Sequence, residues 1–125
     1  MPTTFDVIVL GTGSAARNVA YTCREAGWSV AVVDDHPFGG TCQLRGRDPK
    51  KVLVGVADLV DWSRRMQGQG VLAPGLSISW PDLICFKRTF TDPVPEQTEW
   101  SFEQAGIITR HGRAHFVEGP RMTRL

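Results

Sequence analysis

The chain has 125 residues, enough for one domain with a modest buried core. A net charge of +1, with 42% hydrophobic and 22% charged residues, indicates an ordinary globular protein without a basic surface for nucleic acid. No apolar run reaches membrane-spanning length, and the first residues lack a signal region, so we expect a cytoplasmic protein that binds neither nucleic acid nor membrane.

Two short apolar runs and the segment between them predict a βαβ unit. Residues 5–10 are almost continuously apolar, which is typical of a strand buried in a parallel sheet. Residues 14–26 place apolar side chains on one helical stripe, and residues 28–33 form a second apolar run that ends at Asp34 and Asp35. We therefore expect an α/β, Rossmann-like domain: a parallel sheet with helices on both faces.

The rest of the chain predicts a loop, three helices and two more strands. Proline and glycine clusters separate these elements. Because the last strand has no obvious partner, we expect a sheet that is incomplete, as in a truncated Rossmann-like domain. The predicted loop covers residues 39–49, the helices cover 49–67, 79–92 and 97–105, and the strands cover 106–109 and 112–117, with Gly119 and Pro120 closing the last one.

A glycine-rich turn joins the first predicted strand to the first predicted helix. Gly11 permits a tight turn, Gly13 lets the backbone approach a pyrophosphate, and Ala16 lets the helix pack closely on the strands. The backbone N–H groups at the helix start, at Ser14, Ala15 and Ala16, would face a diphosphate, which the helix dipole also favours. The pattern predicts a dinucleotide site; its plain alternative is an ordinary strand-to-helix turn.

The acids after the second predicted strand strengthen that interpretation. Asp34 follows Gly13 by about 20 residues, the spacing of an acid that accepts hydrogen bonds from ribose hydroxyls. Asp35 is adjacent and could share the role. An acid here disfavours a 2′-phosphate, but it does not distinguish FAD from NAD.

A second motif follows, built from Gly39-Gly40-Thr41-Cys42, Gly46, Pro49 and Lys51. It closely resembles the redox loop of the pyridine nucleotide-disulfide oxidoreductases. The resemblance extends to the first glycine turn, to Asp34 and to Gly112-x-Ala114, and so covers essentially the whole chain. It implies FAD as the cofactor, with Gly40, Thr41 and Cys42 along it, Lys51 near the reactive edge of the flavin, and Ala114 beside the adenine.

One departure from the family pattern affects the expected chemistry. The second cysteine of the family's redox pair should stand at position 47, which is Arg47 here. A dithiol needs two sulfurs, one to attack and one to resolve the mixed disulfide, so we expect no ordinary disulfide reduction. Cys23 and Cys85 fall in predicted helices and are expected to be small buried apolar residues. The spacing of the three cysteines also predicts no metal site.

The roles of the two loop residues remain open at this point. Cys42 is either the single remaining catalytic thiol, beside a helix start and the cations of Arg45, Arg47 and Lys51, or a relic. Arg47 either binds an anionic substrate or is a solvated surface residue.

The sequence thus predicts the FAD-binding portion of a flavin-dependent oxidoreductase that passes electrons from NAD(P)H through FAD to an acceptor. The resemblance implies further NAD(P)H-binding and dimerisation domains, which 125 residues cannot contain. NAD(P)H is therefore expected as a partner only if those domains are supplied, and the family's dimerisation makes a homo-oligomer worth testing. The alternative is a non-catalytic FAD- or dinucleotide-binding module, or a truncated remnant, so whether this chain alone is an enzyme stays undecided.

Overall fold

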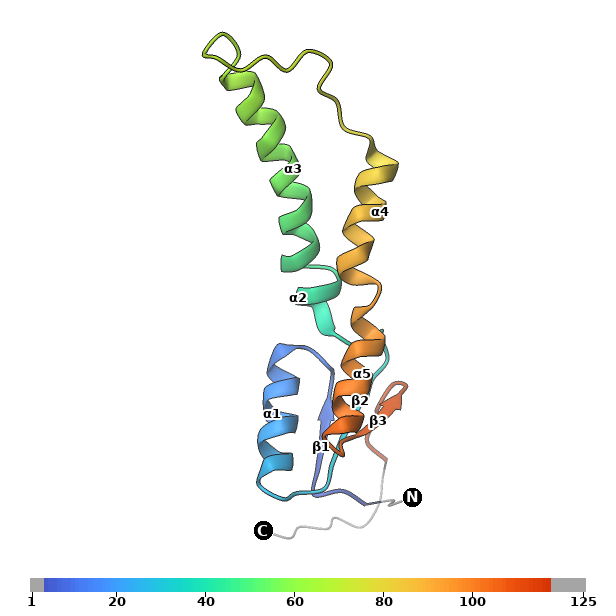
Figure 1. Cartoon of the computed structure of the whole chain (residues 1–125). Coiled ribbons are helices and arrows are strands. Elements are labelled where there is room, and N and C mark those ends of the chain that lie inside the picture. The colour runs from blue at the N-terminus through green and yellow to red at the C-terminus, as the bar shows by residue number, and fades with distance from the viewer. Residues whose placement is uncertain (1–3, 118–125) are drawn as a thin grey trace.

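In the computed structural model, which describes residues 4–117, three strands form one parallel sheet (Figure 1). The strands are β1 (Val7–Leu10), β2 (Val30–Asp34) and β3 (Ile108–His111), and β2 lies in the middle. The predicted end of a last strand, at residues 119 and 120, lies outside the described residues.

The strand register brings the carboxyl ends of all three strands to one edge. Leu10 of β1 pairs with Val33, and Asp34 pairs with His111 of β3. β2 runs through Asp34 rather than ending at residue 33, because the Gly112 N–H extends the ladder by donating to the Asp34 carbonyl at 2.9 Å. The predicted ribose-binding acid is thus the last residue of the central strand.

Helices flank this sheet, which confirms the predicted α/β class. They are α1 (Ser14–Glu25), α2 (Gly40–Leu44), α3 (Arg47–Arg65), α4 (Trp80–Thr91) and α5 (Val94–Gln104). Within residues 4–117, none of these helices has both the length and the apolar character needed to cross a membrane.

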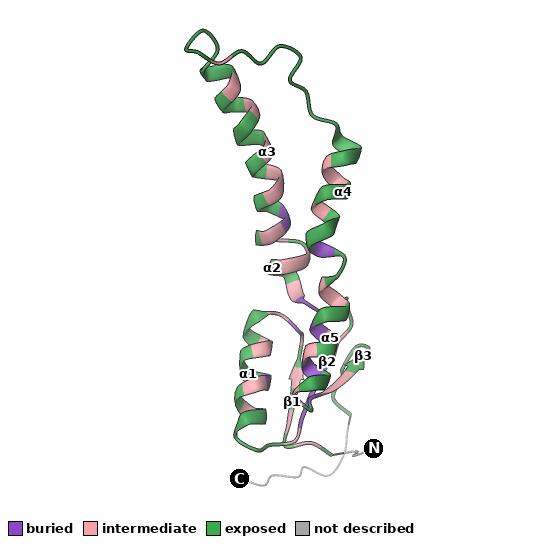
Figure 2. Ribbon diagram, in the orientation of Figure 1, coloured by how far each residue is buried: buried purple, intermediate pink, exposed green. Residues whose placement is uncertain are grey.

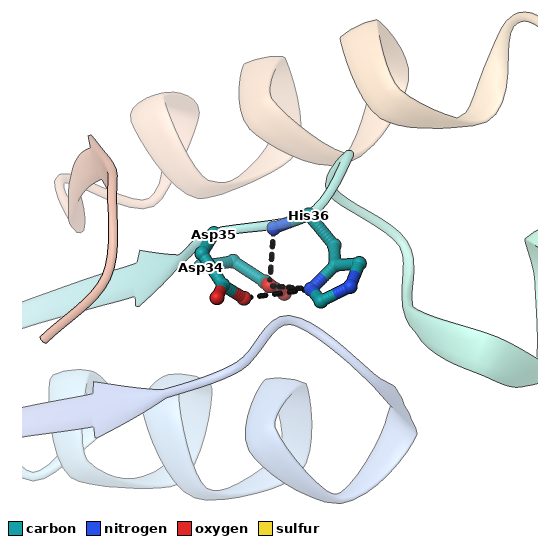
Figure 3. A group of neighbouring side chains, drawn as sticks. All are labelled: Asp34, Asp35 and His36. Atoms are coloured by element: carbon teal, nitrogen blue, oxygen red, sulfur yellow. Dashed lines mark hydrogen bonds and ion pairs between the residues drawn. The ribbon is translucent and has the colours of Figure 1, made fainter.

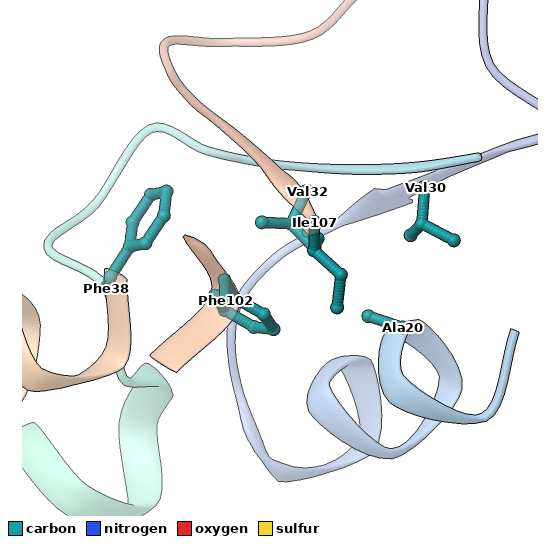
Figure 4. Close-up of a cluster of buried hydrophobic side chains, with 6 residues drawn as sticks. All are labelled: Ala20, Val30, Val32, Phe38, Phe102 and Ile107. Carbon is teal, nitrogen blue, oxygen red and sulfur yellow. The ribbon is translucent and has the colours of Figure 1, made fainter. Parts of the chain in front are cut away.

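The core lies between the sheet and the two helices α1 and α5. We call these elements, together with residues 35–46 that follow β2 and include α2, the sheet half. The ring of Phe102 stacks on Tyr21 of α1 at 5.4 Å between centroids and meets Phe38 edge-on at 6.4 Å. On β1, Val9 packs against this core, whereas the alternating Ile8 and Leu10 are 56% and 60% exposed. The cluster in Figure 4 consists of Ala20, Val30, Val32, Phe38, Phe102 and Ile107.

The helices α3 and α4 lie side by side and project away from the sheet (Figure 1), and we call them the helical pair. Most of their surface is exposed (Figure 2), including large apolar side chains such as Trp62 at 64% and Phe86 at 54%. Cys85 also lies here and is exposed, so its predicted burial is wrong. Cys23 is partly buried against the core, as a small apolar residue would be.

The structure corrects several predicted boundaries, and the strand predicted at residues 106–109 is β3 at Ile108–His111. The predicted loop over 39–49 contains the short helix α2, and α3 begins at Arg47. α5 begins earlier than expected, because Pro95 in its first turn occupies a position that needs no N–H donor. Residues 112–117 are not a strand: Gly112 has φ +144°, which turns the chain out of the sheet, and Phe116 is fully exposed.

Candidate functional site

Two adjoining cavities lie over the carboxyl edge of the sheet, where parallel α/β folds bind ligands. They share Gly11 and Asp34 in their walls, so together they form one cleft. The first, of about 240 Å³, is lined by Gly11, Thr12, Gly13, Asp34, His36, Pro37, Gly40, Thr41 and Arg45. The second, of about 220 Å³, is lined by Leu10, Gly11, Val33, Asp34, Asp35, Gly112, Arg113 and Ala114.

Thr12 ties the three segments of the first cavity together. Its side chain is fully buried; the hydroxyl donates to Asp34 Oδ2 at 2.7 Å and accepts from the Gly39 N–H at 3.0 Å. This residue was not among the predicted site residues, because the glycine pattern leaves its position free. A hydroxyl between two glycines, with an acid ending the next strand, is the signal that could have found it.

Asp34 is held as an ionised acceptor at the centre of the cleft. Its second carboxylate oxygen accepts from the His36 backbone N–H at 3.0 Å (Figure 3). Burial opposes ionisation of the carboxyl, but the hydrogen bonds from Thr12 and His36 outweigh it, so the pKa of Asp34 lies below its ordinary value. A carboxylate in this state can accept hydrogen bonds from ligand hydroxyl groups.

Asp35 and His36 extend the acidic end of β2 toward solvent. His36 Nδ1 lies 2.6 Å from Asp35 Oδ1 and 3.9 Å from Asp34 Oδ1 (Figure 3). The ligand-type atoms of the three residues lie within 4.8 Å of one another, a spacing that a metal ion could use. Since the closest contacts pair these groups with each other and with Thr12, the cluster is explained by internal hydrogen bonding.

Gly40 is where the two glycine loops touch. Its φ is +76°, and a Cβ added there would lie 2.4 Å from the Gly13 Cα, a distance that only a shift of backbone could relieve. A Cβ at Gly13 would instead meet Gly40 at 3.8 Å, an ordinary contact. Gly40 is therefore the residue of this pair that cannot accept a side chain without a backbone shift. Both glycines line the first cavity, where they expose bare backbone.

The helix α1 begins beside this point, with Gly13 as its N-cap residue. The Arg17 N–H donates to the Gly13 carbonyl at 2.9 Å, so the earlier N–H groups, at Ser14, Ala15 and Ala16, have no carbonyl of their own helix to bind. In the described part of the chain, no side chain caps this end of α1. These donors are free to bind an anion.

The predicted cofactor residues that line the cleft are Gly11, Gly13, Asp34, Asp35, Gly40, Thr41 and Ala114. Those that do not line it are Ser14, Ala15 and Ala16, at the start of α1, together with Cys42 and Lys51. Cys42 is an exposed residue of α2 and Lys51 an exposed residue of α3; neither is among the lining residues of the two cavities. Arg45 does line the first cavity and Arg113 the second, and both were missed as site residues. Arg45 lies three residues after Cys42, and Arg113 occupies the free position of Gly112-x-Ala114; arginines so close to a glycine motif are too common in sequences to be singled out.

Arg47, at the position of the expected second cysteine, pairs with its neighbour. Its Nε donates to Asp48 Oδ1 at 3.0 Å, and this bond raises the pKa of Arg47 above its ordinary value. Arg47 is 63% exposed. The cysteines of the described chain, Cys23, Cys42 and Cys85, are all free.

Comparison with known proteins finds similar chains among curated enzymes. The chain is 34% identical over 113 residues to a dihydrolipoyl dehydrogenase of Chlamydia muridarum, covering 90% of this chain and 24% of that protein. It is 30% identical over 119 residues to a glutathione reductase of Burkholderia cepacia, covering 95% and 26%. A mercuric reductase of Streptomyces lividans is 29% identical over 123 residues, covering 96% and 26%. These relatives, which cover most of this chain, are all pyridine nucleotide-disulfide oxidoreductases.

These relatives confirm the resemblance expected from the two glycine motifs. No family model matches the chain. The chain spans about a quarter of the length of the curated pyridine nucleotide-disulfide oxidoreductases it matches. The dihydrolipoyl dehydrogenase, glutathione reductase and mercuric reductase are FAD-dependent flavoproteins.

Proposed function

We propose that this chain supplies the FAD-binding portion of a flavin-dependent oxidoreductase, which passes electrons from NAD(P)H through FAD to an acceptor. The observation that carries the proposal is the cleft in which the Thr12 hydroxyl joins the first glycine loop to Asp34 and Gly39. The chain's relatives support FAD as the dinucleotide.

The dinucleotide end of the cofactor fits the groups that line the cleft. The free N–H groups at the start of α1 would bind the pyrophosphate, and the bare backbone at Gly13 and Gly40 would let it approach closely. Asp34, ionised and held by two donors, would accept from the ribose hydroxyls with Asp35 beside it. The backbone near Ala114, in the second cavity, would lie against the adenine.

The flavin end is assigned to Thr41, Cys42 and Lys51 by analogy with the family. When bound, FAD would supply the two-electron chemistry of the reaction. Lys51 would offer a positive charge near the ring, which favours the negative charge that reduction creates. Arg47 leaves Cys42 without a partner for an intramolecular disulfide, so we propose that the acceptor is not a disulfide reduced through a cysteine pair on this chain.

The reaction as a whole would need more than these residues. We propose that residues 1–125 form part of a FAD-binding domain, and that NAD(P)H binding comes from a further segment or a separate chain. The relatives, about four times as long as the matched region, support this division. A homo-oligomer is the second arrangement to test, by light scattering of the FAD-bound protein.

The cofactor proposal is tested by adding FAD to the purified chain and recording its visible spectrum and thermal stability. We expect a bound flavin band and a raised melting temperature. Asp34→Asn should weaken FAD binding by about tenfold, because the carboxylate that accepts from the ribose is lost. Asp61→Asn, on the exposed side of α3, is the matched control and should bind FAD as the wild type does. A folded chain that FAD does not stabilise would contradict the proposal.

The redox part is tested separately by adding NADPH anaerobically to the FAD-bound chain. We expect FAD binding without bleaching, because NAD(P)H binding is proposed to come from a further segment or a separate chain. Bleaching of the flavin band would contradict that division and would support an oxidoreductase complete in this chain. Arg47→Cys should not restore disulfide reduction in the chain alone; recovery of that activity would show that the missing cysteine is the only deficit.

A further inference from the structure

A third cavity lies away from the cleft, between α1, α2 and α5. Its volume is about 160 Å³, and it shares no lining residue with the two cavities of the cleft. Its walls come from Arg17 of α1, Gln43 of α2, and Val94, Gln97, Thr98 and Ser101 of α5. No acidic residue is among them.

The guanidinium of Arg17 is incompletely paired. Its Nη2 donates to Gln43 Oε1 and to Thr98 Oγ1, both at 2.6 Å, while its Nε is buried and has no hydrogen-bond partner within residues 4–117. Among residues 4–117, no carboxylate lies within ion-pair distance of it. A guanidinium offers five N–H donors, so most of its capacity and all of its charge remain unmatched. Arg17 as a whole is partly buried, but its Nε–H is fully buried, and a buried donor without an acceptor is costly.

The neighbours of Arg17 also present donors to the cavity. Because an arginine can only donate, Gln43 Oε1 and Thr98 Oγ1 must both act as acceptors toward it. The amide NH₂ of Gln43 and the hydroxyl hydrogen of Thr98 are then left to donate elsewhere, and Thr98 is only 5% exposed. Gln97 brings a second amide to the same cavity. The site therefore combines a positive charge with a surplus of donors.

We propose that this cavity binds a small tetrahedral oxyanion of the phosphate or sulfate class, with Arg17 as its counter-ion. Such an ion supplies many acceptor oxygens and the missing negative charge. The cavity volume is well above what a single water needs. The ion would connect α1, which starts at the cleft, to α2 and α5, and its binding does not depend on FAD.

The test is an NMR titration of the whole chain with inorganic phosphate, against chloride at the same ionic strength, following the amide signals of Gln43 and Thr98. We expect both to shift and to saturate together. Arg17→Met should weaken phosphate binding by about tenfold or more, because it removes the counter-ion. Arg45→Ala, which alters only the cleft, should leave these shifts unchanged.

A second variant keeps the proposal falsifiable should Arg17→Met fail to fold. Gln97→Glu leaves both hydrogen bonds of Arg17 intact but places a carboxylate at the cavity, so it should also abolish the phosphate-dependent shifts. Unchanged shifts in Gln97→Glu would overturn the proposal. So would a wild type in which phosphate and chloride act alike, or one in which Arg45→Ala rather than Arg17→Met removes binding, since the ion would then lie in the cleft.

Discussion

Among residues 4–117, the large apolar side chains that are fully buried lie in the sheet half, whereas many of those in the helical pair are exposed. In the sheet half, Phe38 and Phe102 are completely buried, whereas Trp62 and Phe86 of the helical pair are more than half exposed. Full burial of a side chain of this size contributes roughly 1.5–3 kcal/mol, and an exposed one contributes little. The comparison locates the stability of the chain in the sheet half, which also carries the cleft and the Arg17 cavity.

The largest expected difference comes from truncating one phenylalanine in each region. Phe102→Ala should lower the free energy of unfolding by about 3–5 kcal/mol, because it opens a cavity beside Tyr21 and Phe38. Phe86→Ala should cost under about 1 kcal/mol, since its ring is 54% exposed. Urea denaturation measures both. Equal losses would show that the helical pair is covered in solution and that the comparison is wrong.

A glycine-to-alanine change should have opposite signs in the two regions. Gly40→Ala forces a side chain into a left-handed backbone and against the Gly13 Cα, and should destabilise by at least about 2 kcal/mol. Gly55→Ala, in the open middle of α3, meets nothing within 4 Å and should stabilise by about 0.5–1 kcal/mol. Thermal unfolding of the two variants measures both changes in stability. A neutral Gly40→Ala would mean that the contact between the glycine loops is not fixed.

The smallest expected effect is a dependence of stability on pH. The folded-state pKa of Asp34 is lowered, so its contribution is fully present above the ordinary value of 3.8 and is lost as the pH falls through the folded pKa. Asp34→Asn should therefore destabilise at neutral pH, and its difference from the wild type should shrink toward pH 3. Asp61→Asn should cost only about 0.3–0.5 kcal/mol, as expected of an exposed pair with Arg65. A difference for Asp34→Asn that stays constant with pH would contradict the assigned hydrogen bonds.

The sequence predicted the parts of the molecule that follow from local pattern. The apolar runs predicted β1 and β2. The spacing from Gly13 to Asp34 predicted that this acid lies near the glycine turn, and it lines the cleft. It did not predict Thr12, Arg17 or Arg45, because their roles depend on residues far away in the chain. Arg17, for example, meets Thr98 only after α5 has packed beside α1. Residues 112–117 have an apolar content that suits a strand, but the turn at Gly112 takes them away from the sheet.

The position of β3 bears on how this chain folds. β1 and β2 are joined by α1 alone, so this parallel pair can form from neighbouring residues. β3 pairs with β2 only after the chain has passed through α2, α3, α4 and α5, and such non-local contacts form slowly. The entropy of closing a loop grows only slowly with its length. We therefore expect that the helical pair can differ in length with little effect on equilibrium stability. We also expect the pairing of β3 with β2 to be the slow step of folding.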